Sequence, residues 1–301
     1  MDTRLLRVLV ELQRLGTLRA VAAATGYGTS AVSQQLAALE REVGKPLVEP
    51  EGRRLRLTPA GRRLAEHGRR ILAAVAEAHA ALDPQAEPSG VLRIAAYAGA
   101  ISRDLLPVAR RLAHSHPALR PQLHEHEPDE VLKLLDEGLI DLGFVYDYNL
   151  VPWTCNDPSR LLCETPLVLA VPASEHVPGA ADFREALTVH ARSPWVLNSR
   201  GQADDELVAR VCALAGFTPV VVHRADSLEL VLDIVAAELG VALVPEFIRE
   251  REGVVFVPLA GLDVRRRMYA VTRPGGWDWP GVRLVVDLVA NDVAADRAAA
   301  R

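Results

Sequence analysis

Cysteine is scarce in this sequence, and the arrangement of the few cysteines argues against two of their structural uses. Only Cys155, Cys163 and Cys212 occur among 301 residues, far apart and without a CxxC pair. Their number is odd, whereas a disulfide framework needs paired cysteines and a cysteine zinc site needs closely spaced ones. We therefore expect a chain without disulfides that works in the reducing cytoplasm.

Long hydrophobic runs are missing as well. Asp2, Arg4 and Arg7 stand where a signal peptide would have its apolar core. The most apolar later stretch, residues 231–245, contains Asp233 and is too short to cross a bilayer. The sequence predicts no membrane span and no membrane partner.

The sequence also lacks the common catalytic motifs. The chain has no GxSxG elbow, Walker loop or HExxH pair, and no histidine is tied to Ser199 or Asp226 by its spacing. The glycines at positions 26 and 28 follow an expected helix, whereas a dinucleotide fingerprint follows a strand. We expect a protein that is not an enzyme and that binds no cofactor.

Two histidines invite a metal hypothesis. His124 and His126 fall on the same face of an expected strand, with His114 and His116 nearby. A metal-dependent enzyme is one interpretation, and a polar face at a sheet edge or subunit contact is the other. We favour the polar face and predict no metal.

Charge is distributed unevenly along the chain. The first seventy residues hold 13 Lys/Arg and 7 Asp/Glu, and the remaining 231 hold 21 and 32, so a net charge of −5 conceals a +6 head and a −11 body. Such a split suggests that a small basic module meets a polyanion while a larger acidic module does something else.

The basic module has the pattern of three short helices. Leucines recur at helical spacing in the first helix, at Leu5, Leu9, Leu12 and Leu15. Residues 18–25 and 30–42 form the second and third helices. Ala22, Gly26 and Val32 then supply a small residue at the helix contact, a flexible turn and an aliphatic anchor, as a helix-turn-helix requires.

A hairpin and a long helix follow. Residues 44–57 are expected to form a two-stranded hairpin that turns at Glu51-Gly52 and has a basic tip. Thr58 and Pro59 open a helix that continues to position 82. One stripe of that helix is apolar: Leu64, Ile71, Val75, Ala78 and Leu82. A lone helix cannot bury this stripe, so it packs on another domain or on a second chain; we favour pairing of two chains.

The remaining residues read as an α/β body after a linker at 83–90. Short apolar strands alternate with amphipathic helices, which predicts a parallel sheet with helices on both faces. The strands are expected at 92–97, 122–127, 141–146, 167–171, 195–197, 220–223, 241–244, 254–258 and 267–272. The body is large for one compact sheet, so we expect two lobes with a cleft between them.

Several motifs resemble one family over nearly the whole chain. Residues 17–40 are similar to the helix-turn-helix signature of the LysR-type transcriptional regulators, and residues 53–61 to the wing and linker-helix start of that family. Residues 138–142 and 239–245 resemble strand-entry motifs of its effector-binding domain.

The resemblance implies an α/β fold class in three parts. A mainly α winged helix-turn-helix domain is expected at 1–57, a linker and dimerisation helix at 58–82, a hinge at 83–90 and an effector-binding domain at 91–301, shaped like a periplasmic binding protein. Its lobe I would comprise 91–163 and 268–301, and its lobe II 164–267. The resemblance also implies a homodimer through the linker helices, often assembled into a tetramer.

The chain departs from the family pattern in three places. Val48-Glu49-Pro50 lacks a common phosphate-contacting arginine, which puts the affinity of the wing for the DNA backbone in doubt. Gly28 replaces a capping serine and leaves Thr29 or Ser30 to serve the free N–H groups of the recognition helix. Gly99 and Ala100 replace a serine or threonine of the first effector loop.

Candidate DNA contacts follow from the helix-turn-helix geometry. The side chains at the start of the recognition helix reach base edges: Thr29, Ser30, Ser33 and Gln34. Gln34 can pair with both N6 and N7 of adenine, although an ordinary solvated glutamine is the alternative. Phosphate contacts are expected from the wing arginines Arg53, Arg54 and Arg56.

Candidate effector contacts lie where strands end, since open α/β sheets place their ligands there. They are Tyr97, Gly99, Ala100, Ser102, Tyr146, Asp147, Asn198, Ser199, Arg200, Asp226 and Ser227. The backbone N–H groups of Gly99 and Ala100 and the guanidinium of Arg200 suit an anion, and for each residue an ordinary loop or cap role is the alternative.

The leading hypothesis is therefore a sequence-specific DNA-binding transcriptional regulator whose C-terminal domain senses a small-molecule effector. Its candidate partners are double-stranded DNA, an anionic effector, further copies of the chain and RNA polymerase. The alternative is an effector-binding or protein-interaction module with a weakened DNA-binding head, which Pro50 motivates. Coordinates that bury positions 29–34 would overturn the leading hypothesis.

Overall fold

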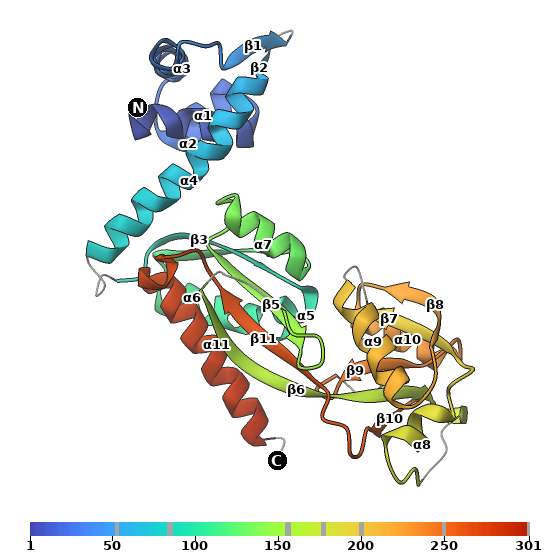
Figure 1. Cartoon of the computed structure of the whole chain (residues 1–301). Helices are drawn as coiled ribbons and strands as arrows, with labels where there is room; N and C mark the ends of the chain where they lie inside the picture. The colour runs from blue at the N-terminus through green and yellow to red at the C-terminus, as the bar shows by residue number, and fades with distance from the viewer. Residues whose placement is uncertain are drawn as a thin grey trace.

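The computed structural model describes residues 1–51, 54–82, 87–153, 158–175, 179–198, 202–248 and 251–299. Figure 1 shows a small helical head, the long helix α4 leading away from it, and a body in which the C-terminal helix runs beside a curved sheet. No helix within these ranges is both long enough and apolar enough to cross a membrane.

The head consists of three helices and a hairpin. They are α1 (Thr3–Leu15), α2 (Leu18–Thr25), α3 (Thr29–Val43), β1 (Val48–Glu51) and β2 (Arg54–Leu57). Asp2 and Thr17 cap α1 and α2 by accepting backbone N–H groups. Leucines and valines from all three helices form one buried cluster beneath the hairpin. The expected helix-turn-helix with a two-stranded wing is therefore present.

The start of the recognition helix differs from the expectation. Gly28 is the N-cap of α3 and provides no side-chain hydrogen bond, so neither Thr29 nor Ser30 acts as the cap. Both residues already have helical positions within α3. Instead, α3 is tied down at its other end, because Glu40 Oε1 accepts the N–H groups of Leu47 at 2.7 Å and Val48 at 3.1 Å.

Helix α4 (Pro59–Leu82) packs tightly on the head through its glycines. Thr58 Oγ1 accepts the N–H of Gly61 at 3.0 Å and thereby caps the helix. A Cβ atom at Gly61 would lie 2.0 Å from the carbonyl oxygen of Leu47, and one at Gly68 would lie 3.0 Å from the side chain of Leu6. Only glycine permits so close an approach of α4 to the hairpin and α1.

Two arginines of α4 connect the head to the body. Arg69 donates to Oε1 of Gln13 in α1 at 2.5 Å and to the carbonyl oxygen of Glu137 at 3.4 Å. Arg70 donates to the carbonyl oxygen of Asp136 and to its carboxylate, both at 2.8 Å. One turn of α4 thus holds α1 on one side and the end of α7 (Pro128–Asp136) on the other.

The half of the body nearer to α4, lobe I, is built on five strands. They are β3 (Gly90–Ala96), β4 (Leu119–Glu125), β5 (Leu142–Tyr148), the first half of β6 (Ser159–Pro172) and β11 (Arg265–Val271). Its helical segments are α5 (Ala98–Ala100), the π-helical turn η1 (Ile101–Leu105), α6 (Leu106–Ser115), α7 (Pro128–Asp136), η3 (Gly276–Asp278) and α11 (Pro280–Ala299).

The other half, lobe II, continues from the second half of β6. Its strands are β7 (Pro194–Asn198), β8 (Val220–Ala225), β9 (Ala242–Pro245) and β10 (Val254–Pro258). Its helical segments are η2 (Ala173–Glu175), α8 (Phe183–Thr188), α9 (Gln202–Leu214) and α10 (Leu228–Ala236). Because β6 pairs β11 over 159–166 and then β9 and β10 over 167–172, one continuous strand joins the two lobes.

The sheet is mixed, which corrects the expectation of a parallel sheet. Strand β3 is parallel to β4 and β5, and β7 is parallel to β8. Strands β6 and β11 pair antiparallel to their neighbours because they carry the chain between the lobes in opposite directions. The parallel prediction is correct only where a helix returns the chain to the same side.

The C-terminal helix α11 packs along lobe I and continues to Ala299. Valines at 282, 285, 286, 289 and 293 are buried against the core of lobe I. Asp292 also pairs with Arg111 at 2.6 Å.

Candidate nucleic-acid interface and interlobe site

The N-terminal half of α3 presents a polar face to solvent. Thr29, Ser30, Ser33 and Gln34 are all exposed. Val32 on the same helix is fully buried in the cluster of the head. The four side chains proposed for base contacts therefore lie together on a free helical face, which a duplex can approach.

In the wing, Arg56 forms ion pairs with two glutamates. Arg56 Nη2 lies 2.8 Å from Glu49 Oε1, and Arg56 Nη1 lies 3.4 Å from Glu51 Oε1. Arg54 belongs to β2, and Arg53 falls outside the described residues. Glu49 and Glu51 thus engage the guanidinium of the arginine that was predicted to contact a DNA phosphate.

The predicted dimerisation stripe of α4 packs on the head at its start and is open further along the helix. Gly61, Ala65 and Gly68 are buried, whereas Val75 is 37% exposed. Leu64 contacts the core of the head, Ile71 is half-buried and Ala78 is exposed. The side chain of Leu82 falls outside the described residues. The second half of the stripe is therefore open within one chain.

The first effector loop is only partly available to a ligand. Tyr97 follows β3 and is buried, Gly99 is half-buried and Ser102 is exposed. Ala100 packs its side chain into the core, and its N–H donates to the carbonyl oxygen of Tyr97 at 3.0 Å. The N–H of Ala100 is thus already hydrogen-bonded, contrary to the expectation that it would face an anion.

Tyrosines of lobe I meet an aspartate of lobe II. The hydroxyl of Tyr148 donates to Asp204 Oδ1 at 2.6 Å, and the hydroxyl of Tyr146 lies 3.4 Å from both Asp204 Oδ2 and Glu127 Oε2. Asp204 is 5% exposed, and burial raises the pKa of its carboxyl group to about 7. These hydrogen bonds hold the lobes together at the start of α9.

An arginine lies beside these tyrosines at the join of the lobes. The guanidinium of Arg266 in β11 is 5.1 Å from the ring centre of Tyr97, 5.2 Å from that of Tyr146 and 5.0 Å from that of Phe247, which follows β9. Arg103 stacks on Phe247 at 3.8 Å and pairs with Asp104 at 2.8 Å. We call Tyr97, Tyr146, Tyr148, Asp204, Phe247 and Arg266 the interlobe cluster.

Sequence reasoning found two members of this cluster and missed four. Tyr97 and Tyr146 were predicted as effector contacts, whereas Tyr148, Asp204, Phe247 and Arg266 were not. Tyr148 follows Tyr146 at the two-residue spacing of one strand face, which was a usable signal. Arg266 had no such signal, because only the pairing of β11 with β5 brings it opposite Tyr148.

The remaining predicted effector residues have other positions. Ser227 caps α10 by accepting the N–H of Leu230, and Asp226 precedes it after β8. Asn198 ends β7, with its side chain outside the described residues, as are Ser199 and Arg200. Asp147 is buried in an ion pair with Arg267 at 2.6 Å and accepts the N–H of Trp153 at 2.8 Å.

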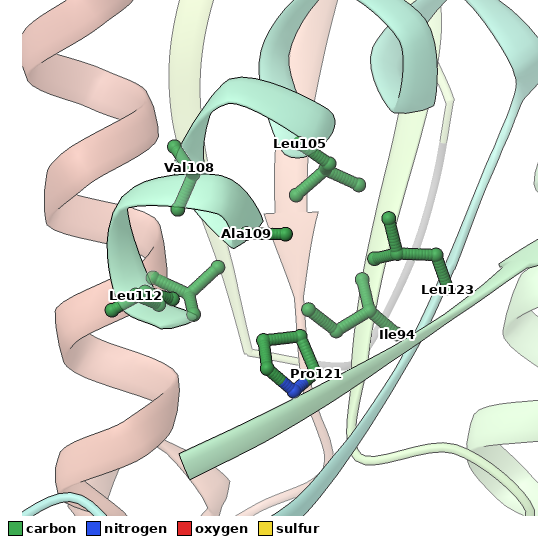
Figure 2. Close-up of a pocket in the computed structure, with 8 residues that line it drawn as sticks. Ile94, Leu105, Val108, Ala109, Leu112, Pro121 and Leu123 are labelled. Atoms are coloured by element: carbon green, nitrogen blue, oxygen red, sulfur yellow. The ribbon is translucent and has the colours of Figure 1, made fainter. Parts of the chain in front are cut away.

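Neither the histidines nor the apolar depression in lobe I offers a second site. His126 Nδ1 lies 3.2 Å from Glu130, and among the described residues no group of three or more potential metal ligands occurs. Figure 2 shows the depression beneath α6, lined by residues that include Leu105, Val108 and Leu123. Its empty volume is about 160 Å³, yet it has no room for a water molecule.

The fold and these two sites define a class of protein: a regulator that joins a winged helix-turn-helix head to a two-lobed ligand-sensing body. The bacterial regulatory helix-turn-helix model of the lysR family matches residues 3–62, and the LysR substrate binding domain model matches residues 85–294. The chain therefore belongs to the LysR family and is a DNA-binding transcriptional regulator with an effector-binding domain.

Known proteins resemble the chain over most of its length. A probable hydrogen peroxide-inducible genes activator from Streptomyces viridosporus is 31% identical over 231 residues, which cover 75% of this chain and 72% of that protein. A full-length OxyR variant from Pseudomonas aeruginosa has a TM-score of 0.69 at 19% identity and covers 97% of each chain. Full-length CbnR complexed with its target DNA has a TM-score of 0.61 at 21% identity and covers 97% of this chain and 99% of that chain.

Proposed function

We propose that α3 reads the base sequence of its target through Thr29, Ser30, Ser33 and Gln34. The observation that carries this proposal is the exposure of these four side chains above a buried interior. A recognition helix contacts base edges with its N-terminal residues while the rest of the motif grips the backbone. Arg53, Arg54 and Arg56 of the wing supply the phosphate contacts, which add affinity without sequence choice.

The test is duplex binding by the full chain, measured by fluorescence anisotropy with DNA from the promoter region beside the gene. Affinity is expected to fall steeply as salt rises, because phosphate contacts release counterions. Gln34→Ala should lower the discrimination between the preferred base and its competitors by about 1–3 kcal/mol. Gln122→Ala, an exposed glutamine on β4, is the control. An unchanged preference in Gln34→Ala would remove Gln34 from the set that reads bases.

The alternative is an effector-binding or protein-interaction module whose DNA-binding head is weakened. It is supported by Pro50 in the wing and by the ion pairs of Arg56 with Glu49 and Glu51. Absence of duplex binding even at low salt, in a chain that still unfolds cooperatively, would favour this alternative over base reading.

The active assembly that we propose is a homodimer through the second half of α4, with a tetramer as the larger form. The support is the apolar stripe at Ile71, Val75 and Ala78, which lies beyond the turns of α4 that pack on the head and is open at Val75 and Ala78. Val75→Asp should shift the chain toward monomers in light scattering, whereas Glu66→Asp on the same helix should not. An unchanged mass for Val75→Asp would place the dimer contact elsewhere.

A small molecule bound between the lobes is the proposed input, and binding alone, without catalysis, is the proposed chemistry. Among the described candidates, Tyr146 of lobe I reaches Asp204 of lobe II, and the ring of Tyr97 packs edge-on against Tyr146 with ring centres 4.8 Å apart. A ligand that prefers one arrangement of the lobes shifts the arrangement of the heads, and one that binds all arrangements equally shifts nothing. RNA polymerase is the proposed downstream partner, and the cytoplasm the proposed compartment.

Peroxide sensing is a second candidate, because the Streptomyces relative is a probable hydrogen peroxide-inducible activator. A sensing cysteine reacts as an accessible thiolate. Cys163 and Cys212 are buried, and burial raises the pKa of the Cys212 thiol to about 12, so neither suits this role. Cys155 lies outside the described residues. Mass spectrometry of the peroxide-treated chain, in wild type and Cys155→Ser, tests the candidate. Oxidation of Cys155 at stoichiometric peroxide in the wild type would support peroxide sensing, and a wild-type chain whose three cysteines stay reduced would rule it out.

A further inference from the structure

Helix α4 is joined to the head and to the body in different ways (Figure 1). Its first half packs on the head through apolar contacts, since Leu64 and Ala65 belong to the buried cluster of the head. Gly61 and Gly68 also bring α4 close to the hairpin and α1. Within the described chain, no side chain of α4 belongs to a buried apolar cluster of the body. The head and α4 therefore form one unit, whose orientation on the body depends on polar contacts.

These polar contacts gather at the C-terminal end of α7. Arg69 donates to the carbonyl oxygen of Glu137, and Arg70 donates to the carbonyl oxygen and the carboxylate of Asp136. A helix ends in free carbonyl groups and has a partial negative charge there, so two guanidinium groups suit this position. A Cβ atom at Gly138 would lie 3.5 Å from the backbone of both arginines, so α4 passes directly over this turn. We call the contacts of Arg69 and Arg70 with Asp136 and Glu137 the α4–α7 junction.

The α4–α7 junction is weaker than the packing of α4 on the head. The side chains of Arg70 and Asp136 are 49% and 74% exposed, and exposed ion pairs contribute little to stability. The hydrogen bond from Arg69 to Glu137 is long, at 3.4 Å. Because such contacts open at low cost, the junction orients the head and contributes little to the stability of the fold.

Helix α7 is closed at both ends and seated firmly on the sheet. A capping box closes its start, with Glu127 as the N-cap. At its end, the N–H of Gly138 donates to the carbonyl oxygen of Leu135 at 3.0 Å. Gly143 of β5 lies so close beneath the helix that a Cβ atom there would be 2.5 Å from the side chain of Val131. Helix α7 and β5 therefore move together.

The start of α7 lies beside the contact between the lobes. Glu127 Oε2 is 3.4 Å from the hydroxyl of Tyr146, which is also 3.4 Å from Asp204 Oδ2 in lobe II. Tyr148, on the same strand as Tyr146, donates to Asp204 at 2.6 Å. A displacement of lobe II therefore acts on β5 and on the start of α7. The helix has nine residues and is about 14 Å long, so it joins the lobe contact to the α4–α7 junction.

We propose that α7 transmits the arrangement of the lobes to the head, and that Arg69 and Arg70 are the positioning residues that receive it. Arg69 also donates to Gln13 of α1, so the junction reaches into the head itself. The orientation of each head sets the distance between the two recognition helices of a dimer, and thereby the spacing of the half-sites that they fit. The proposal rests on the proposed function and adds the route by which the body acts on the head.

The first experiment measures how strictly the full chain selects half-site spacing. The probes are duplexes with two copies of the half-site footprinted in the promoter region beside the gene, at distances changed one base pair at a time. Wild type should bind the best spacing about tenfold more tightly than the worst, and Arg69→Ala/Arg70→Ala should reduce this ratio to about twofold. Binding to a duplex with one half-site should stay within about twofold of wild type, because the recognition helix is unchanged.

Arg111→Ala is the matched control. It also removes an arginine from an ion pair of the body, with Asp292 at 2.6 Å, but this pair joins α6 to α11 and does not involve α4 or α7. The control should keep the wild-type ratio. The proposal is overturned by a wild type that does not distinguish the spacings, or by a double variant that keeps the wild-type ratio. An equal loss of binding to the single half-site would assign the effect to the head and also overturn the positioning role.

The second experiment tests the route along α7. Tyr148→Phe removes the 2.6 Å hydrogen bond between the lobes. It should change the spacing ratio about threefold in a chain with an intact α4–α7 junction and leave it unchanged in Arg69→Ala/Arg70→Ala. Such non-additivity shows that two distant sites act through a shared element. An equal effect in both backgrounds, or no effect in either, would overturn transmission through α7.

Hydrogen exchange of the DNA-free chain separates this proposal from the proposed function. Amides at 9–15 in α1 and at 134–140 at the end of α7 should exchange faster in Arg69→Ala/Arg70→Ala than in wild type, because the junction is open. Arg111→Ala should leave both segments unchanged. Faster exchange in a chain that binds no duplex would sink the proposed function and leave the junction supported. Unchanged exchange in both segments would overturn the junction.

Discussion

The head and the interlobe cluster place their polar side chains in opposite surroundings. In the head, Thr29 and Gln34 point into solvent from a helix that is anchored by a tight apolar core. In the interlobe cluster, Asp204 and Arg266 are each at most 5% exposed and lie where two lobes meet. The head thus forms its polar surface from one compact domain, whereas the cluster is formed by residues of both lobes.

The difference fits the sizes of the two proposed partners. A duplex is too large to be enclosed, so its reader must be rigid before contact and must leave its donors in water. A small molecule can be enclosed, and burial strengthens each hydrogen bond that it makes while excluding water. Enclosure also couples binding to the lobes, because Asp204 and Phe247 arrive from the second lobe. Three changes test this contrast.

The largest effect is expected from Gly61→Ala, which disturbs the close packing of α4 on the hairpin of the head. The new Cβ would lie 2.0 Å from the carbonyl oxygen of Leu47, so α4 or the hairpin must move. We expect a loss of about 3 kcal/mol in the free energy of unfolding of the head, measured by denaturant unfolding, together with weaker DNA binding. Glu66→Ala, exposed on the same helix, should change neither. Wild-type stability in Gly61→Ala would mean that the head tolerates rearrangement.

A smaller, pH-dependent effect is expected from Asp204→Asn at the lobe contact. The pKa of Asp204 is raised by burial to about 7 in the folded chain and is near its ordinary value when unfolded, so the folded state binds the extra proton between these values. This contribution to stability is complete at low pH and is lost as pH rises through 7.

The measurement is the melting temperature of wild type and Asp204→Asn from pH 5 to pH 8. The stability of the wild type relative to the variant should fall by about 2 kcal/mol over this range, since each unit of pH is worth at most about 1.4 kcal/mol for one proton. Tyr146, Tyr148, Glu127 and Arg266 also face this carboxyl group and are unchanged in the variant. A parallel pH dependence of the two proteins would show that Asp204 does not titrate there.

The smallest effect is expected from Glu49→Gln in the wing. Removing the carboxylate breaks the 2.8 Å ion pair and leaves Arg56 with only the longer contact to Glu51 at 3.4 Å, so the arginine becomes more available to a phosphate. We expect DNA affinity to rise about threefold at low salt, because exposed ion pairs are worth little. Glu66→Gln controls for the change in net charge. An equal rise in both variants would assign the effect to net charge instead of Arg56.

The sequence predicted the head better than the interlobe cluster, for a physical reason. Helices α1 to α3 and the wing follow from local spacing and turn residues, and their partners lie close by in the chain. The burial of five valines on α11 also has helical spacing, at 282, 285, 286, 289 and 293, so this helix was detectable although it was not predicted.

The interlobe cluster depends on contacts between distant segments. Arg266 meets Tyr146 and Phe247 only because β11 pairs with β5 and the chain after β9 folds back onto the join. Nothing in the run Arg265 to Arg267 distinguishes the arginine that is paired with Asp147 from the one that is not. The pairing of the strands determines which arginine meets Asp147, and this pairing cannot be predicted from the neighbouring residues in the sequence.

The contact of Arg69 with both Gln13 and Glu137 has a thermodynamic consequence. A movement of α7 away from α4 breaks a hydrogen bond made by the same guanidinium that steadies α1. Linkage works in both directions. If ligand binding to the body changes the affinity of the head for DNA by some factor, then DNA binding by the head changes the ligand affinity of the body by the same factor. The ligand concentration that half-saturates the protein would then differ between DNA-bound and free protein.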